Sequence, residues 1–102
     1  MKKYKQFFQG KDIHKNNTNS KPLTGIPNTN LDTYHSVTGM FRSRRKFGST
    51  GFATKDMDVS DEKHPYDHVH DFENGKRSKI RRKPTKKERK EFKKAKRKRR
   101  FF

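Results

Sequence analysis

The sequence predicts a small α+β protein with an antiparallel sheet, made of a hairpin plus a short strand, between a disordered N-terminal segment and a basic C-terminal helix or tail. Three observations support this prediction. The middle of the chain alternates in polarity around two glycine-containing turns. Residues 84–102 begin with a helix-capping pattern. The 102 residues are 25% hydrophobic and 39% charged, which leaves material for one small core and predicts disorder in part of the chain.

Composition divides the chain into three parts. Residues 1–24 are basic and then polar without periodicity, so they are predicted to be a flexible segment. Residues 25–83 are predicted to be the domain, beginning at the turn signal Gly25-Ile26-Pro27-Asn28. Residues 84–102 are predicted to be a basic helical tail.

The first strands of the domain are predicted from alternation. Residues 31–34 fit a short strand or a helical turn. Residues 40–47 fit a strand with one face made by Phe41, Ser43, Arg45 and Phe47. Residues 48–51, with a glycine at each end to accept positive φ, are predicted to turn the chain, and residues 52–57 to return it.

The second half begins with a strand over residues 68–72, which places His68, His70 and Phe72 on one face. Asn74-Gly75 then predicts a type I′ turn. Residues 76–83 fit a fourth strand or an extended arm.

The tail is predicted to begin as a helix. Thr85 is a favourable N-cap, Glu88 completes a capping box, and the helix is expected to reach about Lys98. Phe92 and Ala95 are its apolar residues, so we expect no face wide enough to pack on a core, and good order only on a polyanion.

The charge predicts a polyanionic partner. The net charge is +18, and residues 76–102 hold 17 Lys and Arg against two Glu. Nucleic acid is the first candidate; an anionic membrane surface is weaker, because the tail lacks an apolar stripe. The cations expected to contact nucleic acid are Arg42, Arg44, Lys46, Arg81, Arg82, Lys86, Lys87, Arg97, Arg99 and Arg100.

Other sequence features narrow the class of protein. The chain has no cysteine, which excludes a disulfide framework and cysteine-ligated zinc. It has no apolar run long enough for a transmembrane segment and no apolar region typical of a signal peptide, so we expect it to be cytoplasmic where it is made.

Three histidines fall within seven positions as His64, His68 and His70, with Asp56, Asp58 and Asp61 upstream. Such a group suits two kinds of chemistry. Imidazoles with a carboxylate can bind one divalent metal ion, and His64, His68, His70 and Asp58 are the candidate ligands. Without a metal, two histidines can exchange protons during RNA cleavage while a hairpin arginine stabilises the phosphate. The alternative is a surface loop with no chemical role.

The motifs occur in a recognisable order. They are Gly25-x-Pro27-Asn28, a strand led by Gly39, Arg45-Lys46-Phe47-Gly48-x-x-Gly51, Asp56-x-Asp58, and His64-Pro65-x-x-His68-x-His70-Asp71-Phe72. Over about residues 25–75 this order resembles the small C-terminal toxin domains of bacterial polymorphic toxin systems. The resemblance implies a nuclease, often a ribonuclease, and several such domains are assigned to the barnase-like class.

Carried over by position, the resemblance implies catalytic roles for Arg45, Asp58, His64, His68 and His70, with Arg45 as the phosphate clamp. It also implies RNA as the favoured substrate. If the protein is a toxin, electrostatic complementarity predicts an acidic immunity protein as a partner. The chain is expected to be a free-standing cassette of a phage or other mobile element, delivered to a target cell or packaged in a virion. The rival hypothesis is a non-enzymatic nucleic-acid-binding protein, such as a small phage structural or ribosome-associated protein.

Overall fold

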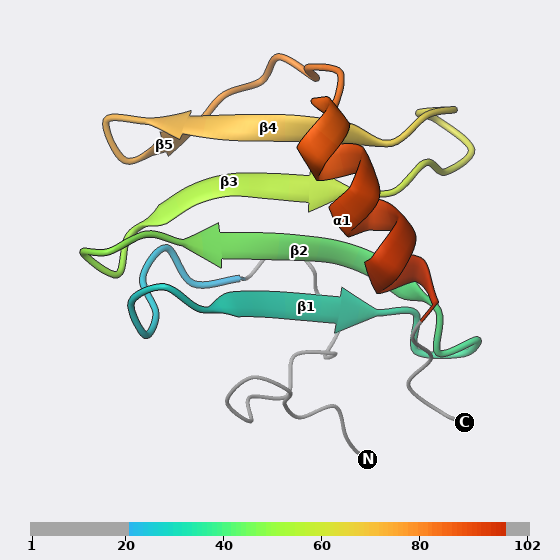
Figure 1. Cartoon of the computed structure of the whole chain (residues 1–102), viewed down its shortest axis with the longest axis horizontal. Helices are drawn as coiled ribbons and strands as arrows, with labels where there is room; N and C mark the ends of the chain where they lie inside the picture. Colours follow the sequence, from blue (N-terminus) through green and yellow to red (C-terminus); the bar gives the residue numbers. More distant parts are fainter. Residues whose placement is uncertain (1–20, 98–102) are drawn as a thin grey trace.

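The computed structural model describes residues 21–97, which form one sheet and one helix. The strands are β1 (Asn30–Tyr34), β2 (Phe41–Phe47), β3 (Ala53–Asp58), β4 (His68–Glu73) and β5 (Lys76–Arg77), and the helix is α1 (Lys86–Lys96). All neighbouring strands are antiparallel, and their order in the sheet follows the sequence (Figure 1). The prediction of an α+β protein with a small antiparallel sheet is confirmed at this level. The predicted disorder of the N-terminal segment falls mostly on residues outside the described part.

Glycine shapes the turn between β2 and β3. The Gly48 N–H donates to the Phe52 carbonyl at 2.9 Å, which closes the hairpin. Of the two glycines, only Gly51 has a positive φ, +88°, so the expectation that both do was wrong for Gly48. A Cβ on Gly51 would lie 2.9 Å from the Gly25 carbonyl oxygen, so this turn also requires a close approach between two backbone segments.

The turn between β4 and β5 is the predicted one. Asn74 and Gly75 have φ values of 53° and 79°, and positive φ at both central residues is what a type I′ turn requires. β5 contains only two residues, and the chain then leaves the sheet. It returns at Arg82, whose backbone exchanges two hydrogen bonds of 2.9 Å with Val69. Residues 76–83 are therefore a short strand followed by an arm.

A bulge in β2 changes the face on which Phe41 lies. Ser43 pairs with Thr33, but the next pair is Phe41 with Tyr34, which leaves Arg42 as the extra residue. The bulge reverses the alternation, and Phe41 packs in the cluster of Met57 and Phe92. The predicted common face of Phe41 with Ser43 and Arg45 was therefore wrong at Phe41.

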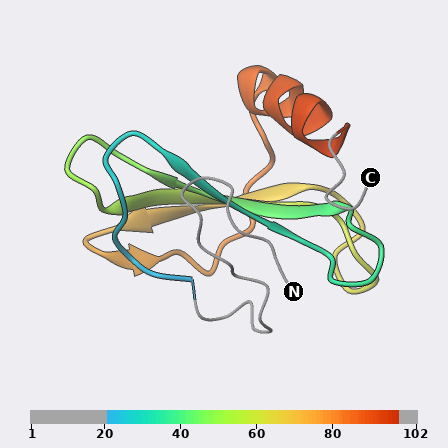
Figure 2. The ribbon, with the colours of Figure 1, turned by 90° about the horizontal axis from the view of Figure 1, so that it is seen from below.

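Helix α1 covers one face of the sheet (Figure 2). Thr85 and Glu88 form the predicted capping box. Phe92 is 2% exposed and packs with sheet residues that include Val69, which is 0% exposed. The expectation that no helix face packs on a core was wrong. A narrow apolar stripe is sufficient here because ion pairs to the sheet flank it.

The acidic residues of α1 make those ion pairs. Glu91 accepts hydrogen bonds from Arg44 and Lys46 of β2, each at 2.8 Å from its Oε2. Glu88, with a 5% exposed side chain, accepts from Arg82 and pairs with Lys55 of β3. The two glutamates thus fix a strongly basic helix to a basic sheet. The predicted extension of the helix to Lys98 lies outside the described residues.

The face of the sheet away from α1 carries a second apolar cluster, made by Leu31, Phe47 and Ala53 with the half-buried Phe72. Residues 21–25 pass along this side (Figure 2). The Ala53 N–H donates to the Leu23 carbonyl at 2.9 Å, and the Gly25 N–H to the Gly51 carbonyl at 2.8 Å. The last residues of the segment predicted to be flexible are therefore bonded to the sheet. Within residues 21–97, no helix is long and apolar enough to cross a membrane.

Candidate active site

Strand register brings the candidate residues together on the face of the sheet away from α1. Asp58 of β3 pairs with Ser43 of β2 and with His68 of β4. Two residues along, Asp56 pairs with Arg45 and with His70. Because alternate residues of a strand share a face, these two rows form a compact polar patch across the three central strands.

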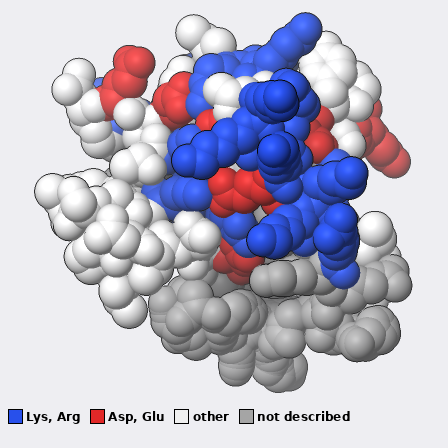
Figure 3. All heavy atoms as spheres, viewed as in Figure 1, with Lys and Arg blue, Asp and Glu red and all other residues white. Residues whose placement is uncertain are grey.

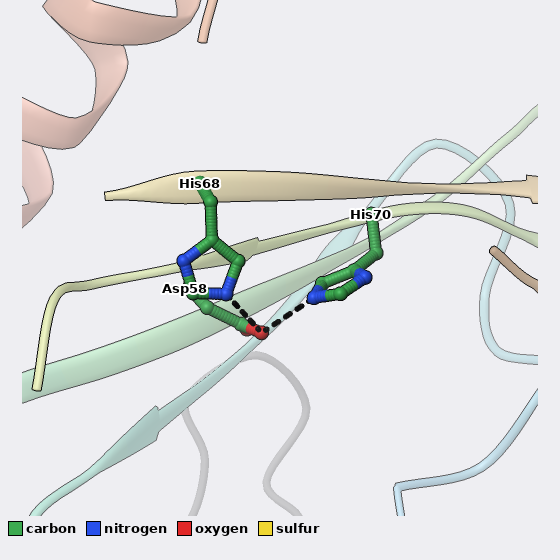
Figure 4. A group of neighbouring side chains, drawn as sticks. All are labelled: Asp58, His68 and His70. Atoms are coloured by element: carbon green, nitrogen blue, oxygen red, sulfur yellow. Dashed lines mark ion pairs between the residues drawn. The ribbon is translucent and has the colours of Figure 1, made fainter. Parts of the chain in front are cut away.

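Asp58, His68 and His70 form the centre of this patch, which we call the triad. The Oδ2 atom of Asp58 lies 3.6 Å from Nε2 of His68 and 3.8 Å from Nε2 of His70. Figure 4 shows both imidazoles projecting from β4 toward this carboxylate. The ring centroids of the histidines are 5.0 Å apart in an edge-to-face arrangement. Both histidines are about 5% exposed or less, so strand packing holds their rings in place.

The other nitrogens of the two rings contact backbone carbonyls. Nδ1 of His70 lies 2.8 Å from the Ser78 carbonyl oxygen, and Nδ1 of His68 lies 3.1 Å from that of Tyr66. A carbonyl only accepts, so each Nδ1 carries the hydrogen, and Nε2 of the neutral ring presents a lone pair. Burial lowers the pKa of His70 below its ordinary value, which favours that neutral form. In its neutral form, each ring presents the Nε2 lone pair to the Asp58 carboxylate.

Arg45 and Asp56 form a buried ion pair beside the triad. The guanidinium donates from Nε to Oδ1 at 2.7 Å and from Nη2 to Oδ2 at 2.8 Å. Burial opposes ionisation of Asp56, but these hydrogen bonds hold its pKa below the ordinary value. Nη1 of Arg45 donates to the carbonyls of Lys21 and Pro22. Arg45, expected to clamp phosphate, is thus a buried side chain whose three nitrogens all have protein partners.

Arg77 is the accessible cation at the triad. Its side chain is 41% exposed, and it donates to Asp58 Oδ2 at 2.9 Å and to Asp56 Oδ2 at 2.8 Å. Sequence reasoning did not select this residue, although a signal was available. A two-residue Asn-Gly turn pairs Phe72 with Arg77, which places Arg77 on the face of Phe72 and His70.

Lys21 is the second cation that sequence reasoning missed. Its Nζ donates to Ser43 Oγ at 2.6 Å, and desolvation lowers its pKa. No local pattern indicated this position, because Lys21 lies in a polar stretch without periodicity.

The triad lines a hollow of about 850 Å³, which we call the site hollow. Cations outnumber carboxylates in its lining, so its field favours an anionic ligand. The lining cations are Lys21, Arg42, Arg45, Arg77, Lys79 and Arg81, and the lining carboxylates are Asp56, Asp58 and Asp61.

His64 lies at the rim of the site hollow. Its ring centroid is 5.3 Å from that of His68, and its Nδ1 is 3.4 Å from Asp61 Oδ1. The same carboxylate accepts the backbone N–H groups of Lys63 and His64, and the bond from His64 is the main cause of the lowered pKa of Asp61. His64 therefore joins the predicted group from a turn, with a third of its side chain exposed.

The structure separates the cations that were expected to contact nucleic acid. Arg42 and Arg81 line the site hollow. Arg44, Lys46 and Arg82 form ion pairs with the two glutamates of α1. Lys86 and Lys87 are exposed on α1, where Figure 3 shows basic side chains gathered, and Arg97 is exposed at the C-cap of the helix. Arg99 and Arg100 lie outside the described residues.

Comparison of the chain with protein-family models, with curated proteins and with solved structures gave no match.

Proposed function

We propose that this protein is a toxin-like nuclease that cleaves RNA in the site hollow. One observation carries the proposal: two buried imidazoles and a carboxylate converge in a hollow where cations exceed carboxylates. Groups able to transfer protons or bind a metal, placed in a cleft that attracts anions, are what cleavage of a phosphodiester requires. The resemblance to toxin domains of the nuclease type supports the same reaction.

The triad suits two routes of cleavage. In the first, one neutral imidazole takes the proton of the RNA 2′-hydroxyl, whose oxygen attacks phosphorus. The second imidazole, in its protonated form, gives its Nε2 proton to the departing 5′-oxygen. This route gives a 2′,3′-cyclic phosphate and a free 5′-hydroxyl. In the second, a divalent metal held by the triad activates water, which hydrolyses the phosphodiester. Only the first route requires the 2′-hydroxyl.

Arg77 is the residue we assign to the phosphate. Arg45, to which the resemblance gave this role, already donates to a carboxylate and two carbonyls. Arg77 is partly exposed and lies within 3 Å of the triad carboxylate. An incoming phosphate could accept from its guanidinium in place of Asp56 or Asp58. Charge developing on the phosphate would then be stabilised by a cation already in position.

The exposed lysines of α1 have a different role in this proposal. They lie on the far side of the sheet from the triad, so a short RNA in the site hollow does not reach them. They would increase affinity for long RNA through contacts with its backbone that do not depend on sequence. An acidic immunity protein that covers the site hollow would inhibit the enzyme by electrostatic complementarity.

The proposal is tested by incubating the full chain with labelled RNA and with the matching DNA, with and without a chelator. The variants are His68→Asn and His70→Asn. The asparagine amide can keep the hydrogen bond that Nδ1 makes to the backbone carbonyl, while Nε2 is removed. His35→Ala, at another histidine that lines the site hollow, is the matched control.

We expect cleavage by the wild type and by the His35 variant, and a loss of at least about 100-fold in each asparagine variant. Cyclic-phosphate ends would identify the first route, and chelator sensitivity the second. Cleavage that survives both asparagine substitutions would show that the triad is not the active site. RNA binding without cleavage, with and without added metal, would refute the proposal that the protein is a nuclease and favour the nucleic-acid-binding alternative.

A further inference from the structure

We infer that Asp58, His68 and His70 form a binding site for one divalent transition-metal ion, with zinc as the best fit. The inference rests on the same side chains as the proposed nuclease site and selects the metal-assisted route for it. Metal binding can be measured without RNA, so the two proposals can fail separately.

The spacing of the donor atoms suits one ion. One ligand atom from each of the three residues lies within 4.8 Å of the other two, and the two distances from Asp58 Oδ2 are 3.6 and 3.8 Å. With bonds of about 2.0–2.2 Å in a tetrahedral site, ligand atoms are about 3.3–3.6 Å apart. The two distances from the carboxylate therefore exceed this spacing by only a few tenths of an ångström, roughly the tolerance of such bonds, and the two imidazole nitrogens lie within 4.8 Å of each other.

The orientation of the imidazoles is the stronger argument. Each Nδ1–H is directed at a backbone carbonyl, of Tyr66 for His68 and of Ser78 for His70. Metal-ligating histidines usually make this second hydrogen bond, because it fixes the tautomer and aims the Nε2 lone pair. Both Nε2 atoms are thereby aimed at the Asp58 carboxylate, so three donor atoms on two neighbouring strands are directed at one point.

The donor set selects the class of metal. Two imidazoles with one carboxylate favour zinc and its first-row neighbours over magnesium and calcium, which prefer oxygen ligands. Three protein ligands also leave at least one coordination position for water or a phosphate oxygen. That position would face the site hollow, which the substrate enters.

Replacing Arg77 tests this inference, because the direction of its effect on metal affinity can be predicted. Its Nη2 donates to Asp58 Oδ2, the atom nearest to both imidazoles, and its charge repels a bound cation. A carboxylate oxygen has two lone pairs, so Arg77 and a metal can share it. Removing the Arg77 charge should therefore strengthen metal binding. If the triad is not a metal site, there is no reason to expect this increase in metal affinity.

The experiment uses the full chain without a polyhistidine tag, first stripped with a chelator. Cobalt(II) is added, and the visible absorption of the ion in a tetrahedral site is recorded; zinc alone is titrated by calorimetry. We expect one ion per chain. His68→Asn, His70→Asn and Asp58→Asn should each weaken zinc binding at least about 100-fold, since one of three ligands is removed. Arg77→Gln should strengthen it several-fold. His35→Ala should leave it unchanged. His64→Ala, at a histidine whose ring adjoins that of His68, should reduce it much less than His68→Asn does.

The inference is overturned if neither the wild type nor Arg77→Gln binds zinc or cobalt at one equivalent, or if Asp58→Asn binds like the wild type. Loss of binding in His64→Ala equal to that in His68→Asn would also overturn the proposed ligands. Metal binding that is lost in the triad variants, without any RNA cleavage by the wild type, would support the metal site and refute the nuclease. Full cleavage by metal-free protein would support the nuclease and refute the metal-assisted route that this inference selects for it.

Discussion

Arg45 and Asp56 form a two-pronged ion pair between β2 and β3, with N–O distances of 2.7 and 2.8 Å. Asp56 is 1% exposed, and the Arg45 guanidinium also lies 4.9 Å from the centroid of the Phe72 ring. Arg45 therefore connects β2, β3, the apolar cluster and the backbone at Lys21. The residue that the resemblance placed on the substrate has the contacts of a structural residue.

The first prediction concerns this pair. Arg45→Met keeps most of the side-chain volume but leaves Asp56 buried with Arg77 as its remaining arginine partner. We expect the free energy of unfolding to fall by about 3–5 kcal/mol, as when one partner of a buried ion pair is removed. Urea denaturation followed by circular dichroism measures it. Arg42→Met, at an exposed position of the same strand, is the control, with an expected change within about 0.5 kcal/mol. Unchanged stability together with abolished RNA cleavage would instead assign Arg45 to phosphate.

The second prediction concerns the attachment of α1. Phe92→Ala removes a ring that is 2% exposed between the helix and the sheet. We expect a loss of about 3–5 kcal/mol of stability, because a buried cavity is left. Lys93→Ala changes the next, exposed residue and should be nearly neutral. Equal urea midpoints for the two variants would mean that the helix does not pack on the sheet in solution.

The parts of the fold that were predictable depend on neighbours in sequence. Alternation placed His68 and His70 on one face, and Asn74-Gly75 predicted its turn because only a few residue types accept positive φ. The capping box of Thr85 and Glu88 is also a local pattern. These local patterns determine the direction in which each side chain points, and they place His68 and His70 of the site on the same face.

The remaining features depend on contacts between distant residues. Asp58 lies opposite His68 because of the register of β3 and β4, which the length of the loop over residues 59–67 does not determine. The bulge at Arg42 likewise has no glycine or proline to indicate it. The helix packs because Glu91 meets Arg44, 47 residues away, and no single-segment pattern contains such a pair.

The third prediction is a dependence of stability on pH that comes from Glu88. Hydrogen bonds from Arg82 are the main cause of a pKa well below its ordinary value of 4.5, and burial acts in the opposite direction. Since the pKa is lower in the folded than in the unfolded state, the stabilisation is complete above about pH 4.5 and is lost as the pH falls below it. Glu88→Gln should therefore be less stable than the wild type at pH 7, and the difference should shrink on acidification. Urea midpoints at several pH values measure this, with Glu62→Gln as an exposed control. A constant difference between wild type and Glu88→Gln would refute it.

The fourth prediction follows from the position of α1 and the triad on opposite faces of the sheet. Lys86, Lys90 and Lys93 follow a helical spacing that points away from the buried Phe92, and all three are exposed. Replacing the three with glutamine should reduce the dependence of long-RNA affinity on salt, by about 0.7 in the log–log slope for each phosphate that the variant no longer neutralises.

For a short oligonucleotide, which occupies only the site hollow, the same triple variant should bind like the wild type. Replacing Lys63, Lys76 and Lys83, three exposed lysines outside the helix, provides a control with the same change in charge. Filter binding over a range of salt concentrations gives both slopes. If both triple variants lower the long-RNA slope equally, net charge and not the helix face governs binding. If the α1 variant weakens the short oligonucleotide as much as the long RNA, the helix and the site hollow act on the same stretch of substrate, contrary to their separation by the sheet.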